Sequence, residues 1–266
     1  MRPPEAEGVR PGAAPAAAAV PEPLRARVMA ALDTVMDPEL DESVAEMGFV
    51  ESLALADGRL DVVFRLPTYW CSANFAFLMA TDMRCALERL PEIDAARIRL
   101  VDHFAARRIN QGVAEGRGFA EVFAGEATTD LAEIRRAFRE RAFLGRQERL
   151  LRALASARGV EAALATTVGE LDGLAGAADP EIATAALRYL ALRRHEPGGT
   201  DPAAPAFVTA AGLAVRPADY VTHLRALKRV RGAAEANAEM CRLYLGARIS
   251  HPAPGCEPEN RKDDDD

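Results

Sequence analysis

LDVVFRLPTYWCSAN, residues 60–74, joins two different hydrophobic patterns. Apolar residues alternate from Leu60 to Leu66, which predicts a strand, and an apolar stripe at helical spacing from Asn74 to Leu90 predicts an amphipathic helix. Cys71 therefore lies in a strand-to-helix turn, at or just before the helix N-terminus. The free N–H groups and partial positive charge of that end stabilise a thiolate. Cys71 is thus a candidate metal ligand or nucleophile, and the alternative is a buried structural cysteine.

The residues just before Cys71 are candidates for shaping its surroundings. Tyr69 and Trp70, the latter being the only tryptophan of the chain, either shield the thiol from water or close the end of a hydrophobic core. We count Thr68 and Trp70 among the residues that shape the site or contact a partner.

A third strand is predicted over residues 96–101, and His103 follows its end. If this strand lies beside residues 60–66, His103 approaches the Cys71 turn and is a second candidate metal ligand. A surface histidine at a strand end is the alternative. Cys85 lies roughly 21 Å along the helix from Cys71, at ~1.5 Å per residue, so the two thiols cannot share a metal ion and Cys85 is predicted to be structural.

Upstream, a helix is predicted from Leu24 to Met36. It ends at Asp37-Pro38, because a residue before proline is pushed out of the helical region. Asp37-Pro38-Glu39 then forms a rigid turn that holds two carboxylates close together, and the alternative is a solvated acidic loop. Asp57-Gly58 predicts a hairpin between two strands. Residues 24–104 therefore form a compact two-layer α/β domain, in the order helix, hairpin, helix, strand.

The remaining chain is predicted to be helical or disordered. Residues 1–23 carry six prolines and form a disordered arm, and residues 249–266 form a disordered acidic tail. Residues 105–129 are a connecting segment, and residues 130–248 are an all-helical extension with an arginine-rich face. That face is either a solvated surface or a basic groove for an acidic partner. The fold class is α+β.

Composition narrows the classes of protein to consider. The net charge is −7, of which the last ten residues supply −4, so the rest of the chain is near neutral and binding to nucleic acid is disfavoured. No apolar run approaches the length of a membrane span, and the N-terminal alanine run has acidic flanks, unlike a signal peptide. The four cysteines show no CxxC pair. We expect a cytoplasmic protein with reduced thiols, with neither nucleic acid nor membrane as a partner.

The order of these features resembles the small iron–sulfur cluster assembly domain found in SufT and PaaD. The resemblance spans residues 24–104, under a third of the chain. In sequence order it rests on Asp37-Pro38-Glu39-Leu40, Gly48-Phe49-Val50, the Asp57-Gly58 hairpin, Cys71 at the helix start, and the loop from Leu90 to Ile93 before the last strand. Two departures stand at the cysteine, where Tyr69-Trp70 replace a small-residue turn and Ser72 replaces a proline.

The resemblance implies a metal-centre maturation factor that places iron–sulfur clusters or iron into client enzymes. Cys71 would then be the ligand or reactive thiol, and Asp37 and Glu39 would shape the site or contact a partner. Longer relatives with a helical extension accompany bacterial binuclear-iron monooxygenases, so a dedicated client of that class is implied.

Three functions remain open from the sequence. The first is a non-enzymatic assembly factor that binds iron or a cluster transiently. Because one thiolate cannot complete a cluster, this function needs His103, a carboxylate or the Cys71 of a second subunit, which predicts either transient binding or a homodimer. The second is a metal-free adaptor or chaperone for a client. The third is an enzyme with Cys71 as nucleophile and His103 as base.

Overall fold

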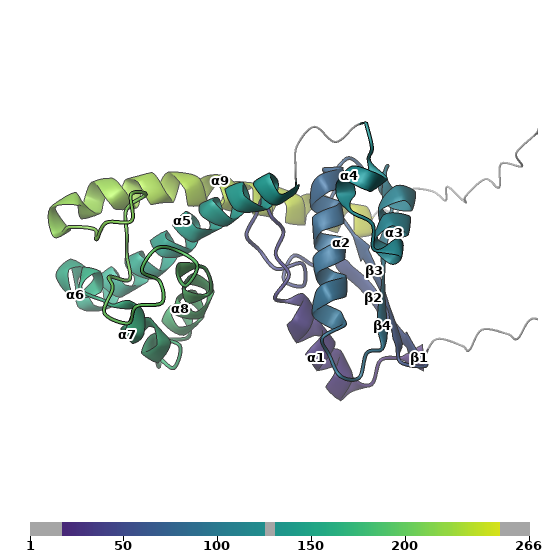
Figure 1. The fold of residues 1–266 in the computed structure, drawn as a ribbon, viewed down its shortest axis with the longest axis horizontal. Helices are drawn as coiled ribbons and strands as arrows, with labels where there is room; N and C mark the ends of the chain where they lie inside the picture. Colours follow the sequence, from purple (N-terminus) through teal and green to yellow (C-terminus); the bar gives the residue numbers. More distant parts are fainter. Residues whose placement is uncertain (1–17, 126–130, 251–266) are drawn as a thin grey trace, which may run out of the picture.

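The computed structural model describes residues 18–125 and 131–250. It confirms the predicted α+β class, since a small sheet with helices is followed by a helical region. The two parts lie end to end along the long axis of the molecule (Figure 1). In the described ranges, no helix has both the length and the apolar character that a membrane crossing requires.

The sheet has the order β1 (Ala18–Ala19), β2 (Val50–Ala56), β3 (Arg59–Arg65) and β4 (Ala95–Val101). β2 and β3 form the predicted antiparallel hairpin, and Asp57 (φ 47°) and Gly58 (φ 74°) adopt the left-handed backbone that a two-residue turn requires. β4 lies parallel to β3. The prediction of disorder is wrong for the last residues of the N-terminal arm, because β1 pairs with β2 through main-chain hydrogen bonds; residues 1–17 lie outside the described residues.

Helices cover one face of this sheet. α2 (Ala73–Leu87) connects the parallel strands β3 and β4, and α1 (Glu22–Leu32) packs beside it. α1 ends four residues earlier than predicted, because residues near Met36 instead form a short bridge to Ser43. α3 (Ala106–Glu115) and α4 (Phe119–Val122) follow β4 in the predicted connecting segment. The buried apolar side chains of this first core include Leu60, Val62, Phe64, Ala76, Met79, Ala80, Met83, Leu87, Ile98 and Leu100.

The helical region has a second hydrophobic core. It is built by α5 (Leu131–Arg158), α6 (Val160–Leu164), α7 (Val168–Leu174) and α8 (Pro180–Arg193). The Asp179 carboxylate caps the N-terminus of α8 by accepting hydrogen bonds from the N–H groups of Glu181 and Ile182. The short 3-10 helix η1 (Pro217–Asp219) leads into the last helix, α9 (Tyr220–Ser250). Residues 126–130, where the predicted connecting segment meets the predicted extension, and residues 251–266 of the predicted acidic tail lie outside the described residues.

α5 and α9 run alongside each other and connect the two parts of the molecule (Figure 1). α9 begins near the second core, where Tyr220 and Leu224 pack, and ends at the first core, where Ala238 and Leu245 are buried. The helical extension is therefore not a free appendage, because its last helix completes the core of the α/β domain.

Candidate functional site

The Cys71 turn lies between the end of β3 and the start of α2, as the sequence predicts. The Cys71 side chain is half-buried, and its sulfur accepts a hydrogen bond from the Thr68 backbone N–H at 3.4 Å. The Thr68 hydroxyl also lies 3.3 Å from the sulfur. Thr68 therefore orients the thiol from within the same turn, a contact suited to the site-shaping role predicted for it.

His103 is brought to the same turn because β4 lies parallel to β3. Its ring is buried, and Nε2 lies 2.7 Å from the carbonyl oxygen of Cys71. The N–H of Ala105 donates to Nδ1 at 3.2 Å, so the hydrogen resides on Nε2 and the ring is neutral. Burial lowers the pKa of His103. Both ring nitrogens thus hold backbone groups in place, and a role as metal ligand or base stays a prediction.

The acidic turn is less exposed than a solvated loop would be. Asp37 is only 8% exposed, and its Oδ1 accepts hydrogen bonds from the N–H groups of Glu39 (2.8 Å) and Leu40 (3.0 Å). Burial raises the pKa of Asp37 to about 6, against these two hydrogen bonds, which lower it. Glu39 is exposed and accepts a hydrogen bond from the side chain of Asn237 in α9. Pro38 separates the two carboxylates, as the sequence predicts.

One cavity of about 100 Å³ brings these groups together. Asp37, Glu39 and Cys71 line it, and so does Cys241 of α9, which the sequence analysis did not single out. Burial raises the pKa of the Cys241 thiol to about 11, and Asp37, Cys71 and Glu39 add to that shift. Leu40, Phe49, Leu66, Pro67, Ser72, Phe75 and Met79 form the other walls. Among the described residues, no three His, Cys, Asp or Glu side chains are grouped so as to hold a metal ion by themselves.

The aromatic residues next to Cys71 lie at the surface, and contact of Trp70 with a partner stays a prediction. Trp70 is 75% exposed, so it neither shields the thiol nor closes the core. The Trp70 ring stacks on the exposed ring of Phe104, with 5.7 Å between the ring centroids. The Tyr69 ring packs edge-on against the Trp70 ring, with 4.8 Å between their centroids. We call these three residues the aromatic patch. Exposed aromatic side chains of this kind suit contact with another protein.

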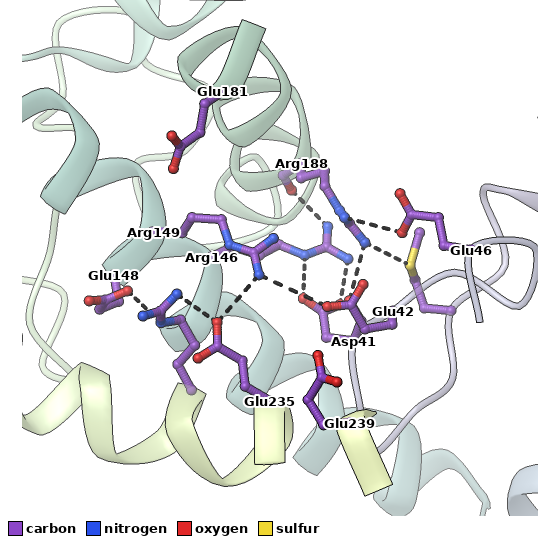
Figure 2. Close-up of polar contacts among 12 residues, drawn as sticks. Asp41, Glu42, Glu46, Arg146, Glu148, Arg149, Glu181, Arg188, Glu235 and Glu239 are labelled. Atoms are coloured by element: carbon purple, nitrogen blue, oxygen red, sulfur yellow. Dashed lines mark hydrogen bonds and ion pairs between the residues drawn. The ribbon is translucent and has the colours of Figure 1, made fainter. Parts of the chain in front are cut away.

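The loop that follows the acidic turn is tied to the helical extension by arginines, and Figure 2 shows these contacts. Arg146 of α5 donates two hydrogen bonds to the Asp41 carboxylate, at 2.6 and 2.9 Å. Arg188 of α8 donates to the Asp41 carbonyl oxygen at 3.2 Å. Arg149 lies within ion-pair distance of both Glu42 and Glu235. Part of the arginine-rich face is therefore occupied by acidic groups of the chain itself.

Comparison with known proteins identifies the first part of the chain. A family model described as iron-sulfur cluster assembly protein matches residues 25–100. These residues form an iron–sulfur cluster assembly domain. The match confirms the resemblance to the SufT and PaaD domain, and it includes Asp37, Glu39 and Cys71 but neither His103 nor Cys241. No curated protein matches the chain, and no solved structure matches it.

Proposed function

We propose that this protein is a maturation factor that carries iron or an iron–sulfur cluster to a client metalloenzyme, with Cys71 as a thiol ligand of the cargo. The observation that carries the proposal is the position of Cys71 within the assembly domain. The half-buried thiol lies two residues before the start of α2 and lines a cavity that Asp37 and Glu39 also line. A thiol placed in this way can bind a metal and still be reached by a receiving protein.

The aromatic patch supports a protein partner that docks at the same place. Trp70 directly precedes Cys71 in the chain, and Phe104 directly follows His103, which binds the Cys71 carbonyl oxygen. A client seated on this patch would lie next to the thiol. The client would then belong to the class that the sequence resemblance implies, the binuclear-iron monooxygenases. Three of the four cysteines are free thiols in the structure, which fits a reducing cytoplasm.

The contacts of His103 disfavour the nucleophilic enzyme that the sequence left open. A general base must reach the proton of the nucleophile. Here Nε2 donates to the Cys71 carbonyl oxygen and Nδ1 accepts from Ala105. Catalysis by this pair would require the ring to leave both partners. A carrier needs no such base, because loss of the thiol proton to solvent is enough for metal binding.

The test is metal loading of iron enzymes in native cells that lack this protein. The cells are complemented with wild type, Cys71→Ala or Cys85→Ala, and their proteins are separated under anaerobic conditions for iron analysis. We expect at least one iron enzyme to lose its metal in the deletion strain and in the Cys71→Ala strain. Cys85→Ala, which removes an exposed thiol on α2, should restore the iron fully.

Two outcomes would overturn the proposal. If every iron enzyme keeps its metal in the deletion strain, the protein is not needed for maturation. If Cys71→Ala restores the lost iron as well as wild type does, the protein acts as an adaptor and its thiol carries no cargo.

A further inference from the structure

One face of α9 is docked on the iron–sulfur cluster assembly domain, and Cys241 lies on that face. Ala238 and Leu245 are buried in the first core, and Cys241 packs against it. Arg248 donates to the carbonyl oxygens of Leu66 at 2.8 Å and Asp102 at 3.0 Å. These residues follow one another at three- and four-residue intervals, so they share one side of the helix. The docking holds Cys241 against the assembly domain, although Cys241 lies far from that domain in the sequence.

The docked face brings the second thiol into the cavity of the first. Cys71 and Cys241 line the same cavity from opposite parts of the molecule, and Asp37 and Glu39 line it with them. Two thiols that face one cavity are a donor pair that suits iron or an iron–sulfur cluster. The small volume, about 100 Å³, suits an ion or a small cluster rather than an organic ligand.

We propose that Cys241 is a second thiol ligand of the metal cargo, so that the binding site spans the assembly domain and the helical extension. This inference rests on the proposed function. It gives the helical extension a direct part in cargo binding, although the extension lies outside the segment that matches the family. The second thiol comes from the same chain, so one chain binds the cargo without the second subunit that the sequence analysis invoked.

Two thiols leave coordination positions open, which a carrier requires. Since no third His, Cys, Asp or Glu side chain is grouped with them among the described residues, the other positions are left for sulfide, solvent or a ligand of the client. A site with a full set of protein ligands would hold the metal as a structural site does.

The test is anaerobic titration of the full-length protein with Co²⁺, a spectroscopic substitute for Fe²⁺. Thiolate-to-cobalt charge-transfer absorption reports how many thiolates bind the ion. The starting protein carries Cys85→Ala and Cys256→Ala, so that unrelated thiols do not contribute. It should bind one Co²⁺ per chain like wild type, with the absorption of two thiolates.

Cys71→Ala and Cys241→Ala are then added singly and together to this background. Each single variant should bind Co²⁺ about 100-fold more weakly or worse, since loss of an outer-shell partner alone costs up to about that much. The remaining absorption should be that of one thiolate. Cys241→Ser, which keeps the size of the side chain, should behave like Cys241→Ala. The thermal unfolding of each variant is measured without metal, and a folded Cys241 variant that has lost the affinity supports the proposal.

The contrary results separate this inference from the proposed function. If Cys71→Ala abolishes binding while both folded Cys241 variants bind like the background protein, the second ligand is not Cys241 and the proposed function stands. If Cys71→Ala binds Co²⁺ as tightly as the background protein does, the site is elsewhere and both proposals fail.

Discussion

Asp37 is a carboxyl group whose burial works against the stability of the fold. It is 8% exposed, and burial raises its pKa to about 6 from an ordinary value near 3.8. At neutral pH the group is therefore ionised in a place that disfavours its charge. Residues that cost stability in this way gather at functional sites. Asp37 lines the cavity shared by Cys71 and Cys241. A role in that cavity would explain why a carboxyl group that lowers stability is present there.

We predict that Asp37→Asn stabilises the protein at neutral pH. Because the folded-state pKa lies above the unfolded one, protonation of Asp37 favours the fold, and this contribution is complete below about pH 4 and lost as the pH rises through about 6. At pH 7.5 the loss amounts to roughly 3 kcal/mol. Asparagine keeps the acceptor for the N–H groups of Glu39 and Leu40 and avoids the loss. Chemical unfolding from pH 4 to 8 measures the gain.

The curves of wild type and Asp37→Asn should converge near pH 4 and separate above pH 6. Asp33→Asn, at an exposed position in the same part of the chain, is the matched control and should follow wild type throughout. Parallel curves for Asp37→Asn and wild type would show that Asp37 does not titrate as its burial requires.

At the level of single residues, the sequence singled out one of the two thiols of the proposed site. Cys71 could be found because the strand and the helix on either side of it are encoded locally. Cys241 could not, because it lies inside a long helix with no neighbouring motif, and only the docking of α9 brings it to Cys71. The exposure of Trp70 was also beyond prediction, since an aromatic residue at a turn can face inward or outward.

α9 is the element on which the site depends most. Its first turns belong to the helical extension, and its last turns complete the core of the assembly domain. Arg248 fixes its end, with hydrogen bonds to the carbonyl oxygens of Leu66 and Asp102 and an ion pair with the Asp102 carboxylate. These contacts hold α9 beside the ends of β3 and β4. The Cys71 turn comes directly after β3 in the chain, and His103 comes shortly after β4.

We predict that Arg248→Ala releases the end of α9. Loss of these hydrogen bonds should lower the free energy of unfolding by about 1–3 kcal/mol. Hydrogen exchange should become faster over residues 238–250 of α9 and stay unchanged in α8. Arg242→Ala, which removes a more exposed arginine from the same helix, is the control and should change neither quantity much. Uniformly faster exchange across the protein would contradict a local role for Arg248.

Most elements were predictable because their signals are local. The Asp57-Gly58 hairpin, the alternation before the Cys71 turn and the Asp179 cap are each visible within a few residues, and the structure has all three. The end of α1 was less predictable, because Asp37-Pro38 forbids a helix beyond Met36 without saying how much earlier it stops. Strand β1 has two alanines and no pattern, and it depends entirely on the edge of β2.

At the scale of the whole molecule, charged contacts join the two hydrophobic cores. Arg146 binds Asp41 with two hydrogen bonds, and both side chains are less than a quarter exposed (Figure 2). No sequence signal pairs residues so distant in the chain. In the proposed site, this joint holds the loop after the acidic turn against the extension that supplies Cys241.

We predict that Arg146 and Asp41 are energetically coupled. A double-mutant cycle with Arg146→Ala and Asp41→Asn, measured by chemical unfolding, should give a coupling energy of about 1–3 kcal/mol. Asparagine suits this position because Asp41 has a positive φ of 54°. The exposed pair of Arg216 and Asp219 is the control and should show no measurable coupling. Equal couplings for the two pairs would mean that the Arg146 contact does not join the parts of the molecule.

The proposed function depends on Cys71 holding a metal cargo. The most direct measurement is the iron and acid-labile sulfide bound per chain after anaerobic reconstitution of wild type, Cys71→Ala and Cys85→Ala. We predict that wild type and Cys85→Ala bind iron and that Cys71→Ala does not, with sulfide present if the cargo is a cluster and absent if it is iron alone. Equal iron in Cys71→Ala and wild type, or no iron in any of the three, would contradict the account.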